Sequence, residues 1–401
     1  MGEVKRSTRV GRAATAPWPA SRRLLLALLL GAIAMAAGFW LKWRLLLYPD
    51  PDAWYLHSWG HLAYTDLVAL YLQQNLVSHP IPYVQTKLEY PVLVGYSQYL
   101  ASLAPGPRGY FLAAGTGLAI AGLGSLWMLH RISPSARLWV LAATPPIALY
   151  ASLNWDLLAI LFVLLALHLF QVRRDGWSGL ALSLGVWTKL FPAVFLLWMV
   201  SKRAGERDWR GVALLVGVFG ATSAALNLPV LLASREGWLY FFEFQGARPP
   251  DGGSLWAHTA RLGWSVPSIN QGSLLLSAAS VLAVLVGALR GGRTVGEYGL
   301  GAVVVVILSS KITSPQYDLW VMPFLAMVSA PLWLVALFSA VDLAYFWTSF
   351  QTLYLWWGGR SDWAQMQPAL AAWVNAAHQG ALLLILLWVT KRMRRRETAH
   401  T

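Results

Sequence analysis

Apolar residues in this chain form long continuous runs that are separated by short polar segments. The runs recur from Leu24 to Thr390, and each approaches the roughly 20 residues that cross a hydrocarbon core as a helix. Because the runs are continuous rather than alternating, they favour helices over membrane strands. The pattern predicts an all-α, polytopic integral membrane protein with about 10–12 transmembrane helices. The predicted spans are 24–41, 109–129, 138–151, 156–170, 178–200, 211–232, 272–289, 298–310, 317–348 and 369–390.

Two of these runs are best read as pairs of shorter crossings. Lys189 and Pro192 lie in the middle of 178–200, and Ala330-Pro331 divides 317–348. With both divisions there are about twelve crossings, both termini are cytoplasmic, and every basic loop faces the cytoplasm, as the positive-inside rule requires. These loops are Arg131–Arg137, Arg173–Arg174, Lys202–Arg210 and Arg290–Arg293.

Composition agrees with a membrane domain. Hydrophobic residues make up 57% of the chain and charged residues only 12%, whereas soluble domains carry about 25% charged residues. We therefore expect one helical membrane domain over 24–390. A disordered cytoplasmic basic tail (1–23) precedes it, and a second cytoplasmic basic tail (391–401) follows it. The formal charge of +14 resides in these tails and in the short loops, so we expect a lipid bilayer rather than a nucleic acid as partner.

The first apolar run has a competing interpretation as a signal peptide. Ala34-Met35-Ala36 resembles a cleavage site. The run is longer than a usual signal-peptide core, and Trp40 and Trp43 after it resemble an interfacial anchor. These features favour a retained span.

Two polar connections fall on the outer side in this topology. The first outer loop, 48–90, contains a stretch from Tyr64 to Val77 with helical periodicity, which predicts an amphipathic helix on the outer membrane surface. The second, 233–270, has phosphate-binding, flexible and stacking side chains, and we expect it to act as a mobile flap over a substrate. Residues 91–104 remain unassigned, with a re-entrant or tilted helix as one option.

Ionisable and polar residues gather at the outer ends of the predicted spans, where such groups are costly and often functional. Asp66 is a candidate general base, or a solvated helix cap. Glu89 is a candidate for sharing the acid–base role or for holding an acceptor sugar, and the alternative is that it caps a helix. Lys189 and Lys311 bind phosphate or snorkel to the interface. The remaining candidates are Arg248 for phosphate, and Tyr90, Asn154, Asp156, Trp256 and Tyr317 for substrate; for Asp156 the alternative is compensation of the helix dipole.

Other motifs carry less. Asp50-Pro51-Asp52 imitates the Asp-x-Asp of nucleotide-sugar enzymes but has no accompanying nucleotide-binding pattern. His57 and His61 have metal-ligand spacing without a third ligand. The chain contains no cysteine, which rules out thiolate sites. We expect neither a catalytic metal nor a cofactor.

The order of short motifs resembles a known family. They are Tyr64-Thr65-Asp66, Leu88-Glu89-Tyr90-Pro91, Asn154-Trp155-Asp156, Trp187-Thr188-Lys189-Leu190-Phe191-Pro192, Gly253-Ser254-Leu255-Trp256 and Ser314-Pro315-Gln316-Tyr317. Together they resemble the glycosyltransferase family 87 membrane proteins of the GT-C superfamily over roughly residues 24–350.

The resemblance implies a GT-C-like fold and an inverting, extracytoplasmic sugar transfer from a polyprenyl-phosphate sugar donor to a glycolipid or glycan acceptor. By this resemblance Asp66 is the general base, Glu89 matches the family's acid before Tyr-Pro, and Lys189 matches the lysine before its proline. Mannose is the commoner donor sugar, and arabinofuranose or another sugar stays open. The rival function is a transporter or flippase of a lipid-linked sugar, since broken helices and intramembrane lysines suit it too.

Overall fold

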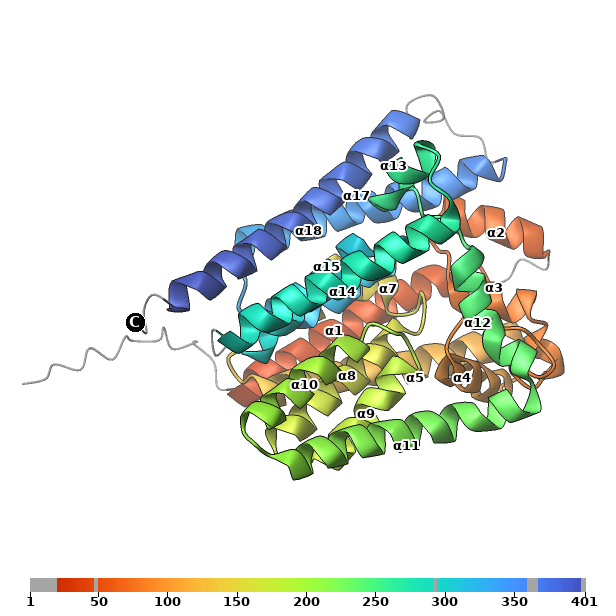
Figure 1. The fold of residues 1–401 in the computed structure, drawn as a ribbon. Helices are drawn as coiled ribbons and strands as arrows, with labels where there is room; N and C mark the ends of the chain where they lie inside the picture. Colours follow the sequence, from red (N-terminus) through yellow and green to blue (C-terminus); the bar gives the residue numbers. More distant parts are fainter. Residues whose placement is uncertain (1–19, 47–49, 291–293, 359–366, 398–401) are drawn as a thin grey trace, which may run out of the picture.

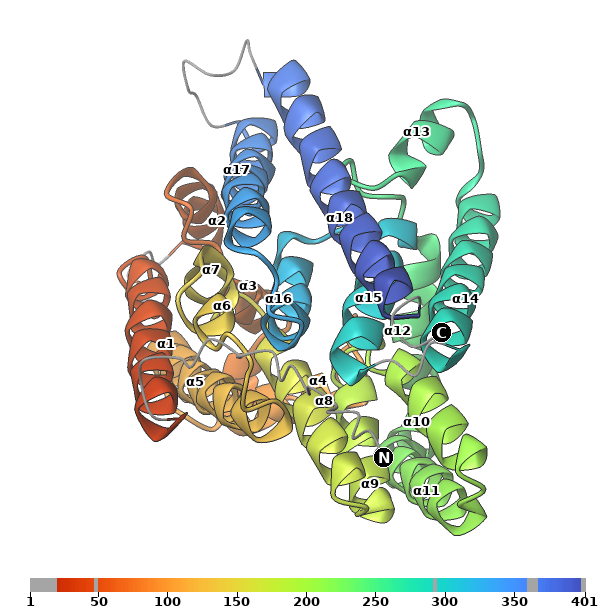
Figure 2. The same ribbon diagram turned by 90° about the vertical axis from the view of Figure 1, so that its left-hand side faces the viewer.

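The computed structural model describes residues 20–46, 50–290, 294–358 and 367–397, and within them it is a bundle of helices. Figure 1 shows the long helices running side by side, and Figure 2 shows the bundle end-on. Among the described residues, six helices are long and apolar enough to cross a membrane, and two shorter apolar helices accompany them. The six are α1 (Ala20–Trp43), α5 (Gly106–Ile132), α11 (Trp209–Ala233), α14 (Val266–Arg290), α17 (Leu332–Trp356) and α18 (Gln367–Glu397). The two shorter ones are α8 (Asp156–Gln171) and α15 (Val295–Ser309).

Both predicted divisions occur where the sequence places them. The run 178–200 separates into α9 (Asp175–Val186) and α10 (Ala193–Gly205), with Pro192 directly before α10. The run 317–348 separates into α16 (Asp318–Met327) and α17, between which Ser329 has a φ of 51°. Proline lacks a backbone donor and disfavours helical geometry in the residue before it, so each break follows from local chemistry.

The span predicted over 138–151 is wrong as a single helix. It forms two short pieces, α6 (Trp139–Ala142) and α7 (Pro145–Tyr150), because Pro145 and Pro146 interrupt the helix after Ala143. The segment 91–104, which was unassigned, forms α4 (Val92–Ser102).

The two segments predicted as outer loops contain more helix than predicted. In the first, α2 (Pro51–Gly60) was missed, and the amphipathic helix spans α3 (Asp66–Gln73), followed by the short helix η1 (Leu76–Ser78). Five consecutive residues of α3 are buried, so it packs into the protein instead of exposing one face. The stretch 233–270, predicted as a flap loop, contains α12 (Arg235–Ala247), α13 (Trp256–Arg261) and the start of α14.

Helices extend into both of the predicted tails. Helix α1 begins at Ala20, inside the tail predicted over 1–23, and residues 1–19 lie outside the described residues. Helix α18 continues to Glu397, well into the segment 391–401.

The described basic ends of α1 and α18 and the basic α10–α11 turn lie at one end of the bundle. In Figure 1 the start of α1, the end of α18 and the α10–α11 turn lie at the left, while α2, α3 and α12 lie at the opposite end. This arrangement agrees with the predicted grouping of the basic loops on one side.

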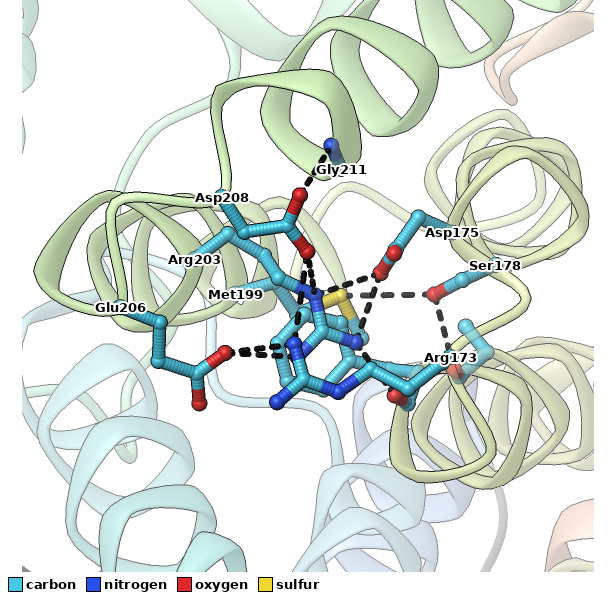
Figure 3. A network of polar contacts seen from close by, with 10 residues as sticks. Arg173, Asp175, Ser178, Met199, Arg203, Glu206, Asp208 and Gly211 are labelled. Atoms are coloured by element: carbon cyan, nitrogen blue, oxygen red, sulfur yellow. Dashed lines mark hydrogen bonds and ion pairs between the residues drawn. The ribbon is translucent and has the colours of Figure 1, made fainter.

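A buried arginine joins four helices at this basic end (Figure 3). The Arg203 side chain is 3% exposed and lies 2.8 Å from Asp175 Oδ1, 3.2 Å from Glu206 Oε2 and 3.8 Å from Asp208 Oδ2. Its Nη2 also donates to the carbonyl of Phe170 at the end of α8. A buried charge is tolerated only when it is paired in this way. Arg203 therefore has a structural role, in which it holds the ends of these helices together.

Candidate active site

Three polar side chains from distant parts of the chain meet at the start of α3. Thr65 caps α3 and donates its hydroxyl to the carbonyl of Ser152, while the Asp66 amide donates to the carbonyl of Leu153. These bonds bring Asn154 to Asp66, and its Nδ2 lies 2.5 Å from Asp66 Oδ2. The Tyr90 hydroxyl accepts from the same Nδ2 at 2.9 Å and donates to Asp66 Oδ2 at 3.4 Å.

Asp156 and Lys189 form a buried pair beside this group. The Lys189 Nζ lies 3.6 Å from Asp156 Oδ2 and 4.9 Å from the centre of the Tyr90 ring. Trp320 Nε1 donates to Asp156 Oδ1 at 2.7 Å. Lys189 lies in the turn before Pro192, between α9 and α10. From this turn its ammonium group points into the protein and pairs with Asp156, instead of extending along a helix to the membrane surface.

Lys311 and Arg248 connect the loop after α12 with the loop after α15. The Lys311 Nζ donates to the carbonyl of Arg248 at 2.5 Å. The Arg248 guanidinium donates to Asp251 Oδ1 at 3.0 Å, and Asp251 Oδ2 accepts from the amide of Thr313 at 3.1 Å. These bonds hold Lys311 and Arg248 close together, and Asp251 links the two loops that carry them.

A cavity of about 440 Å³ lies against these cations. Lys189, Arg248, Lys311, Glu89, Tyr90 and Tyr317 are among its lining residues. Leu190 and Leu274 line it as well and are 48% and 70% exposed. The cavity therefore joins a cationic interior to apolar side chains on the outside of the bundle.

The electrostatics of the cavity are mixed. Burial raises the pKa of the Glu89 carboxyl above its usual range, and the nearby charge of Asp66 adds to this effect. Burial lowers the pKa of the Lys311 ammonium, and the neighbouring Arg248 adds to that shift. A bound anion would relieve the crowding of positive charge between Lys311 and Arg248.

Four of the predicted site residues lie outside the cavity lining. Asp66, Asn154 and Asp156 stand behind Tyr90 and Trp320, as the hydrogen bonds above describe. Trp256 packs over Gly272 and donates its Nε1 to the carbonyl of Ser309, so it supports α14 and α15. In the described part of the chain no group of three or more His, Asp or Glu side chains is placed to hold a metal ion.

Comparison with known proteins decides the family. The family model of glycosyltransferase family 87 matches residues 90–315, which is more than half of the chain. The chain belongs to glycosyltransferase family 87. The matched segment contains Tyr90, Asn154, Asp156, Lys189, Arg248, Trp256 and Lys311.

Two curated relatives of this family 87 chain are mycobacterial enzymes. It is 28% identical over 270 residues to the polyprenol-phosphate-mannose-dependent alpha-(1-2)-phosphatidylinositol pentamannoside mannosyltransferase of Mycolicibacterium smegmatis, covering 63% of each chain. It is 27% identical over 242 residues to the polyprenol-phosphate-mannose-dependent alpha-(1-2)-phosphatidylinositol mannoside mannosyltransferase of Mycobacterium tuberculosis, covering 54% of this chain and 50% of that one. The match therefore spans less than two thirds of either relative. No solved structure matches the chain.

The family 87 chain has a second buried polar cluster that sequence reasoning missed. His378 Nε2 lies 2.9 and 2.8 Å from the two Asp318 oxygens, and the His378 ring stacks on Tyr345 with centroids 4.2 Å apart. Asp342 accepts from the Tyr150 hydroxyl at 2.6 Å. Asp342 and His378 stand inside apolar spans, where an ionisable residue is costly, and that signal alone would have identified them.

This second cluster supports the loops of the cavity from behind. The Tyr345 hydroxyl donates to the carbonyl of Thr313, and Gln379 donates to the carbonyl of Gly253 at 2.8 Å. Asp318 directly follows Tyr317, which lines the cavity. Helices α17 and α18 therefore hold the segments that carry Lys311 and Asp251 in position.

Proposed function

We propose that this protein transfers mannose from a polyprenyl-phosphate mannose donor to an extracytoplasmic glycolipid, with inversion at the anomeric carbon. The observation that carries the proposal is a cavity in which Lys189, Arg248 and Lys311 gather, beside a carboxylate, Asp66, that Asn154 and Tyr90 hold in place. The names of the two mycobacterial relatives support the choice of mannose and of a glycolipid acceptor.

The donor phosphate is assigned to the cationic side of the cavity. Lys189 and Lys311 are only 9% and 8% exposed, so their interactions with a phosphate would be weakly screened by solvent. Arg248 presents a planar guanidinium that suits phosphate oxygens. Preorganised cations of this kind stabilise the charge that develops on a phosphate leaving group.

The polyprenyl tail is assigned to the apolar side. Leu190 and Leu274 connect the cavity to the outside of the bundle, where a membrane protein meets lipid. A donor bound in this way keeps its phosphate among the cations while its tail stays in the hydrocarbon core.

The chemistry is a single displacement. The acceptor hydroxyl oxygen attacks the anomeric carbon, the bond from that carbon to the phosphate oxygen breaks, and the electron pair leaves with polyprenyl phosphate. Asp66 accepts the hydroxyl proton as general base. Asn154 and Tyr90 engage Oδ2 of Asp66 and thereby orient the carboxylate. Glu89 lines the cavity near both substrates and is assigned to holding the acceptor or donor sugar.

The proposal includes the orientation in the membrane. Residues 24–390 form one catalytic membrane domain, both termini face the cytoplasm, and the end of the bundle with α2, α3 and α12 faces outward. The grouping of the basic turns at the other end supports this orientation.

The test is incubation of the purified protein in lipid nanodiscs with polyprenyl-phosphate mannose and a panel of phosphatidylinositol mannosides. We expect a mannosylated acceptor and free polyprenyl phosphate in equal amounts. Replacing the donor with polyprenyl-phosphate arabinofuranose tests which donor sugar the protein transfers. Movement of intact lipid-linked sugar across proteoliposomes, without any transfer, would overturn the proposal in favour of a flippase.

A further inference from the structure

An aromatic cluster lies next to Asp66, outside the donor cavity. Its rings come from α2, from Tyr64 just before α3, and from Trp357 at the end of α17. Tyr55 lies 6.4 Å from Tyr64 and 6.3 Å from Trp357, and Trp59 lies 5.9 Å from Tyr64 and 5.4 Å from Trp357, measured between ring centroids. Both ribbon views show α2 beside the end of α17 (Figures 1 and 2).

The cluster is connected to the proposed base. Tyr64 stands two residues before Asp66 in the chain, and its ring packs near those of Tyr55 and Trp59. Tyr90, which lines the donor cavity, contacts the same carboxylate. Asp66 therefore stands between the donor cavity and the aromatic cluster.

The cluster also offers polar groups and an open surface. Gln73, which is exposed at the end of α3, donates to the Tyr55 hydroxyl at 2.8 Å. Trp357 packs its ring edge against Trp59 and is still 51% exposed. Aromatic rings that combine an apolar face with nearby hydroxyl and amide groups suit a sugar, which has apolar C–H faces and many hydroxyls.

We propose that Tyr55, Tyr64 and Trp357 form the acceptor subsite, which binds a hexose of the glycolipid acceptor. This inference rests on the proposed function. A base must lie within hydrogen-bond reach of the attacking hydroxyl. With the donor cavity on the Tyr90 side of Asp66, the acceptor hydroxyl approaches from the Tyr64 side. The acceptor sugar then stacks on Trp357 while its hydroxyls meet Tyr55 and Gln73.

A tryptophan pair at the end of α17 supplies a matched test. Trp356 is 82% exposed and is the neighbour of Trp357 in the chain, but within the described residues no ring contact joins it to the cluster. Trp357→Ala, Trp357→Phe and Trp356→Ala are compared with wild type. The candidate acceptors are octyl glycosides of mannose, glucose and galactose, and polyprenyl-phosphate mannose is the donor. The glycoside that wild type mannosylates at the highest rate is used for the comparison.

We expect Trp357→Ala to raise the acceptor KM about 10-fold, equivalent to roughly 1.4 kcal/mol, with the donor KM and the melting temperature unchanged. Trp357→Phe keeps a stacking face and should recover much of the loss, while Trp356→Ala should behave as wild type. Tyr64→Phe, which keeps the ring and removes the hydroxyl beside Asp66, should also raise the acceptor KM.

The outcomes separate the two proposals. Transfer to a glycoside by wild type, with the same acceptor KM in Trp357→Ala, overturns the acceptor subsite alone and leaves the aromatic rings as an interfacial membrane anchor. Equal losses in Trp356→Ala and Trp357→Ala overturn it in the same way. A wild-type protein that transfers mannose to no glycoside or phosphatidylinositol mannoside overturns the proposed function, and the subsite with it.

Discussion

The Nδ2 of Asn154 lies 2.5 Å from Oδ2 of Asp66, although 88 residues separate the two positions. The contact exists because the backbone of the α7–α8 turn binds the first residues of α3 through Leu153 and Ser152. One oxygen of Asp66, Oδ2, is therefore held by Asn154 and Tyr90, which fixes the orientation of the carboxylate.

Asp66→Asn tests the assignment of the base. The variant keeps the size of the side chain but cannot accept the acceptor proton. Since general-base catalysis contributes about 10²–10⁴-fold, we expect turnover to fall by that factor while the donor Kd changes little. Steady-state mannosyl transfer and donor binding in the same nanodiscs measure both quantities.

Asp52→Asn is the matched control, because Asp52 is an exposed acid in the same outer segment, and it should retain full activity. Near-normal turnover in Asp66→Asn, together with an inactive but folded Glu89→Gln, would move the role of base to Glu89.

Local chemistry allowed much of the fold to be predicted. Pro192 and Pro331 directly precede α10 and α17, and proline disfavours helical geometry in the residue before it, so both breaks could be predicted from single residues. The predicted topology placed Asp66, Glu89 and Lys189 on one side, and the family resemblance gave them roles in one site. The structure brings their segments to one end of the bundle.

The remaining features depend on contacts between distant segments. Nothing near Asp342 or His378 in the sequence indicates that these residues lie in one buried cluster with Asp318. Trp256 has a side chain that could stack on a sugar. Its contacts with Gly272 and Ser309 show instead that it packs against two helices. The burial of five consecutive residues of α3 could not be predicted either, because it depends on packing against other helices.

Lys189→Met tests the phosphate site. The substitution removes a charge-assisted hydrogen bond worth roughly 1.5–3 kcal/mol, so donor affinity should fall about 10- to 150-fold. It also leaves Asp156 buried without its cation, and breaking a buried pair costs about 3–5 kcal/mol. Thermal melting should therefore show a marked loss of stability.

The double variant Lys189→Met/Asp156→Asn separates these two effects. With no unpaired charge left inside, its melting temperature should recover, but its donor affinity should stay low. A double variant that binds donor as wild type does would show that Lys189 serves only to neutralise Asp156.

The orientation can be measured directly because the chain has no native cysteine. Asp52→Cys lies in α2 and Gly205→Cys lies at the end of α10, and both positions are exposed. We expect a membrane-impermeant maleimide applied to whole cells to label position 52 and not position 205. Labelling of position 205 alone would invert the orientation and place the cavity on the cytoplasmic side.

Glu89→Gln links the electrostatics of the site to stability. An acid whose pKa is raised in the folded protein binds its proton more tightly there than in the unfolded chain. Its ionisation therefore destabilises the fold, and stability is lost as the pH rises through the folded pKa. Glutamine imitates the protonated form of Glu89, so the variant should melt at a higher temperature than wild type at neutral pH. The difference should disappear at acidic pH, where both side chains are neutral.

Melting curves of wild type and Glu89→Gln from about pH 4 to about pH 8 test this expectation. Glu236→Gln is the matched control of opposite sign, because Lys87 lowers the pKa of this exposed carboxylate through a hydrogen bond and its charge. That variant should be slightly less stable than wild type at neutral pH, and the difference should shrink as the pH falls. A lower melting temperature for Glu89→Gln at neutral pH would mean that attraction to Arg248 and Lys189 outweighs burial. The charges of Arg248 and Lys189 would then decide the pKa of Glu89, and burial would not.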